Sequence, residues 1–150
     1  MKRRVAVAIP ARDEARRIRA CLARLLSLES DRRIDAFKVV VLANNCTDDT
    51  ADQVRAMGPD VEVVETNLAP GLDHAGGARR AAFDAAARFL GDSHDVLLST
   101  DADTEVACDW LARTLDHLDA GYDAVAGLVR LKGRELRELE PEHRLRLARG

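Results

Sequence analysis

The sequence contains few aromatic residues, few cysteines and no long apolar segment. One Trp, one Tyr and three Phe make up 3% of the 150 residues, so the hydrophobic core has to be built from Val, Leu, Ile and Ala. The three cysteines are widely spaced and form no Cys-x-x-Cys pair, which fits neither a disulfide framework nor a zinc site. No apolar run reaches the about 18 residues of a membrane-spanning helix. We therefore expect a reducing cytoplasm and no membrane span.

An excess of positive charge is also lacking. The 23 Lys and Arg residues face 26 Asp and Glu residues, a net charge of −3, whereas a nucleic-acid-binding domain typically carries a basic excess. Neither a Walker P-loop nor the Gly-x-Ser-x-Gly motif of α/β hydrolases is present. The apolar run 5–9 follows a basic start but has no small-residue cleavage site after it, which favours a first strand over a signal peptide.

Apolar runs alternate with amphipathic segments along the chain. The predicted strands are 5–9, 37–43, 61–65, 95–100 and 123–129. Apolar residues at helical spacing predict helices over 18–28, 47–57, 78–89 and 106–118, the second with Thr47 as its N-cap. This alternation predicts an α/β fold, a doubly wound and mostly parallel sheet with helices on both faces. We expect one domain over residues 1–130 and a charged helical tail over 131–150.

Polar residues are concentrated directly after three of the predicted strands, in the segments 10–14, 43–49 and 100–104. Doubly wound folds bind ligands beyond the carboxyl ends of their strands. Asp101 and Asp103 follow an apolar strand, and two carboxylates at this spacing can converge on one Mg²⁺ or Mn²⁺. The alternative is a turn in which the two side chains only accept hydrogen bonds from nearby amides.

The acidic pairs 13–14 and 48–49 are less specific signals. Asp13 and Glu14 either contact a nucleotide or complement the positive N-terminus of the helix that follows them. For Asp48 and Asp49 the dipole interpretation is favoured, because they lie in the first turn of a predicted helix.

A glycine pair and the cysteines complete the candidates. Gly76-Gly77 opens a predicted helix, where a backbone and Arg79 can approach a phosphate; the alternative is a flexible loop followed by solvated arginines. His74 is expected to be a surface loop residue. Cys21 and Cys108 are expected to be packing residues, and Cys46 lies in a turn without an evident activating partner.

Four segments together resemble the family 2 glycosyltransferases, which have the GT-A fold. They are Val-Ala-Ile-Pro-Ala-Arg-Asp-Glu (7–14), Val-Leu-Ala-Asn-Asn-Cys-Thr-Asp-Asp-Thr (41–50), Gly-Gly-Ala-Arg (76–79) and Leu-Leu-Ser-Thr-Asp-Ala-Asp (97–103). Each match is short, but the four occur in the family's order and at matching intervals. The resemblance implies a Rossmann-like nucleotide-diphospho-sugar transferase half.

The resemblance also implies a donor site and a reaction. Asp103 of the Asp-x-Asp (DxD) motif would hold Mg²⁺ or Mn²⁺ on the donor diphosphate with Asp101 beside it. The implied nucleotide-sugar-binding residues are Pro10, Ala11, Glu14, Asn44, Asp48, Arg79 and Asp101, and the implied metal ligands are Asp101 and Asp103. The implied reaction moves a sugar from a nucleotide-diphosphate sugar to a hydroxyl acceptor, with inversion, and needs a carboxylate base that the sequence does not identify.

The sequence departs from the family pattern in two ways. Ala43-Asn44 replaces the usual Asp-Asp pair, and Arg12 replaces a Tyr. Only 47 residues follow Asp103, so residues 131–150 are expected to begin an acceptor region that is missing or lies in a partner chain. Two other functions remain open. One is a nucleotide-sugar-binding module without turnover, and the other is a haloacid-dehalogenase-like phosphatase, whose Asp-x-Asp-x-Thr motif resembles residues 101–104.

Overall fold

The computed structural model describes residues 2–28 and 31–130. The chain divides into two compact units, residues 1–113 and 114–150. The predicted tail over 131–150 lies outside the described residues. In the described part of the chain, no helix is both long enough and apolar enough to cross a membrane.

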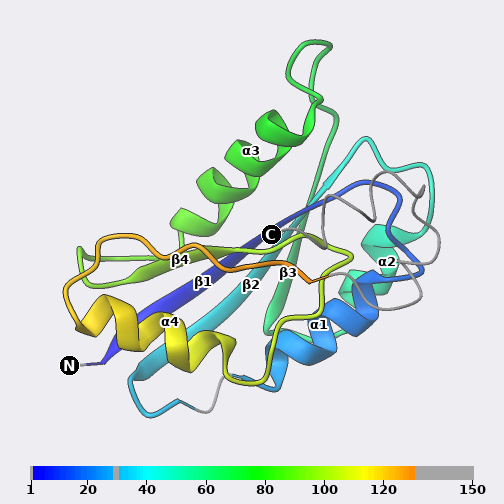
Figure 1. Ribbon diagram of the computed structural model, residues 1–150. Coiled ribbons are helices and arrows are strands. Elements are labelled where there is room, and N and C mark those ends of the chain that lie inside the picture. The colour runs from blue at the N-terminus through cyan, green and yellow to red at the C-terminus, as the bar shows by residue number, and fades with distance from the viewer. Residues whose placement is uncertain (1, 29–30, 131–150) are drawn as a thin grey trace, which may run out of the picture. The chain divides into compact units, whose positions relative to one another are not determined.

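Four parallel strands form the sheet of the first unit (Figure 1). They are β1 (Arg3–Ala11), β2 (Ile34–Asn44), β3 (Val61–Thr66) and β4 (Val96–Ser99), in the spatial order β3-β2-β1-β4. Val7 in the middle of β1 pairs with Val39 of β2 and with Leu98 of β4. The predicted α/β architecture and parallel sheet are thus confirmed.

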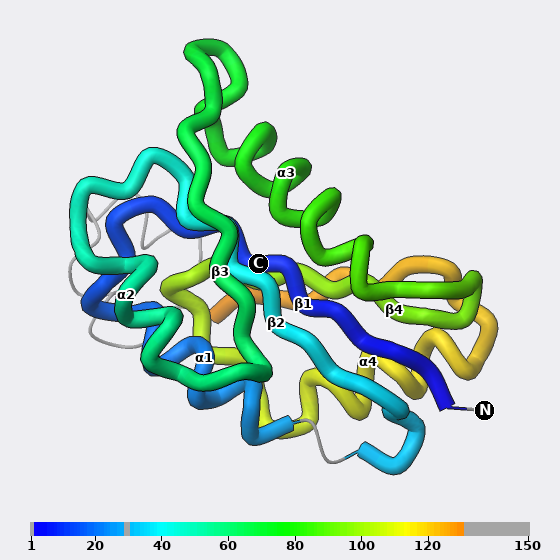
Figure 2. The backbone as a smooth tube through the Cα atoms, turned by 180° about the vertical axis from the view of Figure 1, so that it is seen from behind, coloured from blue at the N-terminus to red at the C-terminus, as the bar shows by residue number. Residues whose placement is uncertain are grey.

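Helices cover both faces of this sheet, as predicted. Ala6 and Ala8 of β1 pack with Ala82 and Ala86 of α3 (Ala75–Ala87), whose small side chains let the helix lie close to the strands. The alternate β1 residues point to the opposite face. Figures 1 and 2 show α1 (Ile18–Leu26) on that opposite side. The buried residues of α1 are Ile18, Cys21, Leu22 and Leu25.

The end of β1 extends beyond the end of β4. Pairing between the two strands stops at Ala8 and Ser99, and the Thr100 amide donates to the Ala8 carbonyl at 3.4 Å. The backbone nitrogen of Pro10, two residues further on, points toward the same neighbour, but β4 has already ended there. A proline is tolerated there because its missing N–H breaks no ladder hydrogen bond.

Sequence predictions about local structure are wrong near residue 47 and over residues 123–129. The helix α2 (Thr50–Arg55) begins after Asp49 and not after Thr47, because the Thr47 amide and hydroxyl both donate to Asp13. Residues 123–130, which follow α4 (Trp110–Asp119), form no strand and are exposed, with Leu128 at 95%. An apolar run becomes a strand only where a neighbouring strand shares its backbone hydrogen bonds, and composition does not supply that neighbour.

Candidate active site

A cleft of about 410 Å³ opens at the carboxyl end of the sheet. β1 has β2 on one side and β4 on the other, so the chain order reverses around β1, and ligands of open α/β sheets bind at such a point. The lining residues come from the ends of β1, β2 and β4 and from the start of α3. They are Pro10, Ala11, Arg12, Glu14, Asn44, Asp73, His74, Ala75, Ala78, Arg79, Asp101, Ala102 and Asp103.

The structure brings together all of the site residues expected from the sequence except Asp48. Pro10, Ala11 and Glu14 line the cleft from the end of β1, Asn44 from β2 and Arg79 from α3; Asp101 and Asp103 line it from the turn after β4. The three strand ends thus meet as their parallel arrangement requires. Asp48 belongs to a neighbouring cluster of hydrogen bonds.

The carboxylates of Asp101 and Asp103 form ion pairs with exposed arginine side chains. Asp101 forms an ion pair with Arg79, and Oδ2 of Asp103 lies 3.7 Å from Nη1 of Arg17. The two Asp side chains are 54% and 49% exposed, whereas Ala102 between them is 3% exposed and anchors the turn. This arrangement presents two carboxylates to the cleft and leaves their oxygens accessible to a ligand.

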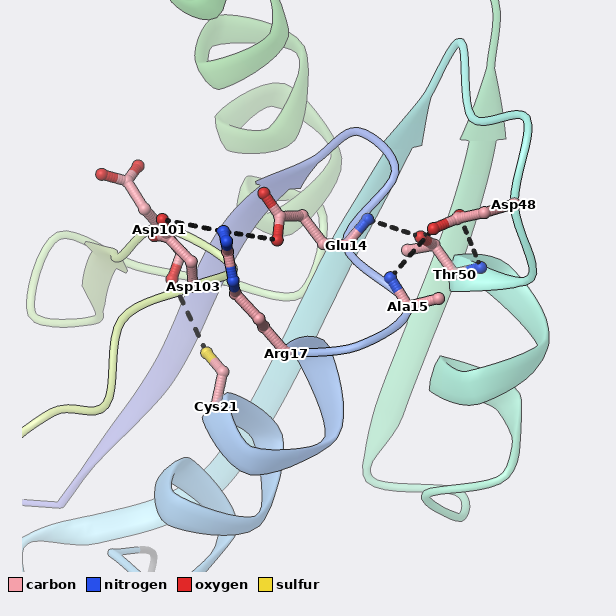
Figure 3. Close-up of polar contacts among 8 residues, drawn as sticks. All are labelled: Glu14, Ala15, Arg17, Cys21, Asp48, Thr50, Asp101 and Asp103. Atoms are coloured by element: carbon pink, nitrogen blue, oxygen red, sulfur yellow. Dashed lines mark hydrogen bonds and ion pairs between the residues drawn. The ribbon is translucent and has the colours of Figure 1, made fainter. Parts of the chain in front are cut away.

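Among the carboxylates that line the cleft, Glu14 has the least exposed side chain. Its Oε2 lies 3.6 Å from Nη1 of Arg17, which therefore lies between Glu14 and Asp103 (Figure 3). Burial raises the pKa of Glu14, Arg17 acts in the opposite direction, and the carboxylates of Asp103, Asp48 and Asp13 raise it further. Glu14 is thus the carboxylate of the cleft whose proton affinity is raised by its surroundings.

The loops after β1 and β2 are joined by reciprocal hydrogen bonds, which we call the loop clasp (Asp13, Thr47, Asp48 and Thr50). Asp13, with a φ of 54°, accepts from the amides of Thr47 at 2.6 Å and Asp48 at 3.2 Å. In return, Asp48 accepts from the Ala15 amide at 3.1 Å.

Thr50 is the buried centre of the loop clasp. Its hydroxyl accepts from the Glu14 amide at 2.8 Å and donates to Asp48 (Figure 3). The hydrogen bond from Thr50, together with backbone amides, lowers the pKa of Asp48. Both oxygens of Asp48 thus hold the two loops in place, and the clasp fixes the backbone that carries Glu14.

Asp13, Cys46 and Asp48 also place one ligand atom each within 4.8 Å of one another. The hydrogen bonds of the loop clasp already use Oδ1 of Asp13 and both carboxylate oxygens of Asp48. The Cys46 thiol faces the Ala11 carbonyl at 3.7 Å. We therefore interpret this group as part of the loop clasp.

Asn44 lies at the end of β2 and is 2% exposed. Its Oδ1 accepts from the Leu68 amide at 3.1 Å, which ties the connection after β3 to the sheet. A buried, hydrogen-bonded amide at this position supports the base of the cleft without adding charge.

The start of α3 forms another wall of the cleft, and its glycines have a packing reason. His74 is the N-cap, and its Nδ1 accepts from the Gly77 amide at 3.2 Å. A Cβ at Gly77 would lie 2.0 Å from the Leu72 carbonyl oxygen, so only glycine fits this close backbone approach. At Gly76 a Cβ would meet only the His74 ring, at 3.3 Å.

Sequence reasoning missed three charged or polar residues of the cleft. Arg12 lies 3.7 Å from Asp73 in an exposed ion pair between the end of β1 and the connection before α3. His74 lines the cleft as well as capping α3. The position of Asp73 and His74 directly before a predicted helix is the signal that could have identified them.

The three cysteines differ in burial. Burial raises the pKa of Cys21 to about 12, which makes its thiol a poor nucleophile and confirms that Cys21 is a packing residue. Cys108 is exposed, so its predicted packing role is wrong: it lies in the turn before α4 and not in the helix.

The sequence matches the description "Glycosyl transferase family 2" over residues 6–149. The chain therefore belongs to glycosyl transferase family 2. No curated protein matches the sequence closely enough to count as a relative.

Several solved structures share the fold at low sequence identity. S. aureus TarS (residues 1–349) in complex with UDP-GlcNAc aligns with a TM-score of 0.60 and 20% identity over 78% of this chain and 31% of that one. Mycobacterium tuberculosis glucosyl-3-phosphoglycerate synthase in complex with Mn²⁺, UDP-glucose and phosphoglyceric acid aligns with a TM-score of 0.57 and 22% identity over 77% and 39%. A 4-diphosphocytidyl-2C-methyl-D-erythritol synthase aligns with a TM-score of 0.55 and 19% identity over 88% and 65%. This chain thus spans well under half the length of the two transferases.

Proposed function

We propose that the chain binds a nucleotide-diphosphate sugar in the cleft and forms the donor-binding part of a metal-dependent, inverting glycosyltransferase with a hydroxyl acceptor. The observation that carries the proposal is the exposed carboxylate pair Asp101 and Asp103 at the point where the strand order reverses. Membership of glycosyl transferase family 2 supports it. The acceptor region and the catalytic base would lie in a further segment or a partner chain.

The charge of the cleft supports the need for a metal ion. Its lining contains four carboxylates, on Glu14, Asp73, Asp101 and Asp103, but only two guanidiniums, a net charge of −2 with His74 neutral. A diphosphate entering this lining alone meets repulsion. A divalent cation neutralises that excess, and carboxylate oxygens are ligands that Mg²⁺ and Mn²⁺ prefer.

The carboxylate oxygens of the cleft are suitable ligands for such an ion. Asp101 and Asp103 have side chains that are about half exposed in the cleft and form ion pairs with arginines. When bound, a divalent cation supplies positive charge that stabilises the departing nucleoside diphosphate. A structural relative in complex with Mn²⁺ and UDP-glucose, and another with UDP-GlcNAc, supports this choice of ion and donor class.

The remaining residues of the cleft bind and orient the donor in this proposal. Arg79 and the N-terminus of α3 favour the diphosphate, because a guanidinium and the positive end of a helix dipole both attract anions. Glu14 accepts hydrogen bonds from the nucleoside, and Asn44 supports the bottom of the cleft. Pro10 and Ala11 form an apolar wall that excludes water. Asp48 acts through the loop clasp.

Calorimetry with UDP and GDP, with and without Mn²⁺, tests the binding site. We expect nucleotide binding only with the metal, and Asp103→Asn should weaken it at least tenfold, because the main metal ligand loses its charge. Asp109→Asn is the matched control, since Asp109 is 53% exposed, pairs with Arg113 and lies outside the cleft. No binding to either nucleotide, or binding that ignores both the metal and Asp103, overturns the proposal.

Turnover separates the transferase from a binding module. Release of nucleoside diphosphate from a nucleotide sugar, dependent on an added hydroxyl acceptor, supports the enzyme, and the anomeric configuration of the product shows whether the reaction inverts. Metal-dependent binding without turnover identifies a binding module. Phosphatase activity without nucleotide binding would instead support the nucleophile interpretation of residues 101–104.

We also propose the reducing cytoplasm as the compartment of this chain. The three cysteines are free thiols, which supports this proposal.

A further inference from the structure

Arg17 links two carboxylates that come from distant parts of the chain. Its Nη1 lies 3.6 Å from Oε2 of Glu14 and 3.7 Å from Oδ2 of Asp103 (Figure 3). Both carboxylates line the cleft, whereas Arg17 itself does not. The guanidinium thus approaches the proposed metal ligand from outside the donor-binding space.

The position of Arg17 follows from the turn that opens α1. The amides of Arg17 and Ile18 both donate to the Glu14 carbonyl at 2.9 Å, which brings the Glu14 and Arg17 side chains to the same side of the turn. Arg17 is the N-cap residue of α1, but its side chain makes no capping hydrogen bond. The guanidinium is therefore not needed to start the helix.

Arg17 and Arg79 differ in what they can do after a metal binds. Arg79 lines the cleft and can turn from Asp101 to a phosphate of the donor. Arg17 has 64% of its side chain exposed and can turn out to solvent. Exposed ion pairs are weak, so a divalent cation can replace the guanidinium on Asp103.

We propose that Arg17 is a counter-ion that occupies Asp103 and Glu14 before the metal binds, and that it sets the metal affinity of the site by competing with the cation. This inference rests on the proposed function, because it takes Asp103 as a metal ligand. Arg17 keeps the two carboxylates together while the site is empty, and the arriving dication displaces it. Arg17 is thus a positioning residue, and the site exchanges one bound positive charge for another.

The test measures Mn²⁺ binding to the full chain by calorimetry without nucleotide. Removal of one positive charge about 4 Å from the ligand oxygen should tighten Mn²⁺ binding about fivefold in Arg17→Gln. Arg17→Lys keeps the charge and should stay near the wild-type affinity. Arg16→Gln is the matched control, because Arg16 is the neighbouring exposed arginine. Thermal unfolding without metal checks that all variants fold.

The outcomes separate this inference from the proposed function. Tighter Mn²⁺ binding in Arg17→Gln, with Arg16→Gln and Arg17→Lys near the wild-type affinity, supports the counter-ion role. Equal affinities for Arg17→Gln and Arg16→Gln, or weaker binding in Arg17→Gln, overturn the counter-ion role while the donor site stands. If the wild-type chain binds Mn²⁺ neither alone nor with UDP or GDP, the proposed function fails and the counter-ion role fails with it.

Discussion

The cleft and the loops that support it are held in two different ways. The loop clasp and the start of α3 are fixed by hydrogen bonds to backbone amides and by close backbone packing, with Thr50 fully buried and Gly77 against the Leu72 carbonyl. The carboxylates of Asp101 and Asp103 are held by ion pairs between exposed side chains. We call the first part the fixed wall and the second part the exchangeable carboxylates.

Energetics explain why the two parts suit different tasks. Leaving a buried donor or acceptor unsatisfied costs about 1–3 kcal/mol, whereas an exposed ion pair contributes only about 0.2–1 kcal/mol. Substitutions in the fixed wall should therefore reduce stability. Substitutions at the exchangeable carboxylates and their arginines should change ligand binding with little effect on stability.

The largest loss of stability is expected at Gly77 in the fixed wall. Gly77→Ala places a methyl group on the Leu72 carbonyl oxygen and should lower the free energy of unfolding by about 3 kcal/mol, near the upper end for overpacking. Gly76→Ala is the control and should cost clearly less, because a flexible side chain is the neighbour there. Urea unfolding measures both values, and equal losses would contradict the packing explanation.

A loss of about 2 kcal/mol is expected for Thr50→Val in the loop clasp. Valine has a similar shape but leaves the Glu14 amide without its acceptor and Asp48 without a donor. Thr50→Ser keeps the hydroxyl and should retain most of the stability. Chemical denaturation of the three proteins measures this, and a Val variant as stable as the Ser variant would show that the Thr50 hydroxyl does not stabilise the clasp.

Arg79→Gln should show the opposite behaviour, with less than about 1 kcal/mol lost in stability. Nucleotide affinity with Mn²⁺ should nevertheless fall about tenfold, because a charged hydrogen bond to phosphate is lost. Arg80→Gln, the exposed neighbour on α3, is the control for a general change in charge. A similar fall in affinity for both variants would remove Arg79 from the site.

An effect that shows only at low pH is expected at an ion pair outside the cleft, between Asp31 and Arg33. The Arg33 hydrogen bonds hold the pKa of Asp31 at about 2, so its contribution to stability is complete above the unfolded pKa and disappears as the pH falls from about 4 to 2. Asp31→Asn should remove this acid-dependent contribution, which a pKa lowered from about 4 to about 2 makes about 2 kcal/mol at neutral pH. Unfolding measured across that pH range checks it, and an unchanged pH dependence in the variant would contradict the assignment.

Much of the fold could be predicted from the sequence, because local pattern determines it. Continuous apolar runs in β1 and β2 indicated strands buried on both faces, and the alternation with helices indicated a parallel sheet. Parallel strands end at one edge, so the segments after β1, β2 and β4 had to meet. The run 123–129 is also mostly apolar but forms no strand, since strand pairing depends on a neighbouring strand as well as on composition.

Partners that are distant in the chain could not be predicted. Asp13 and Asp48 look like helix-dipole residues in the sequence, yet they bond to each other's loops. The contact between Arg17 and Asp103 joins residues that are far apart in the sequence, and no local pattern indicates it. Three-dimensional structure was needed to separate the fixed wall from the exchangeable carboxylates.

Anomalous diffraction at the manganese edge, from crystals of the chain grown with Mn²⁺ and UDP, tests the central claim most directly. The account predicts one strong peak in the cleft beside the carboxylates of Asp101 and Asp103, with Arg17 turned away from Asp103. A peak at Asp13, Cys46 and Asp48 instead, or UDP bound in the cleft without any metal peak, would contradict it.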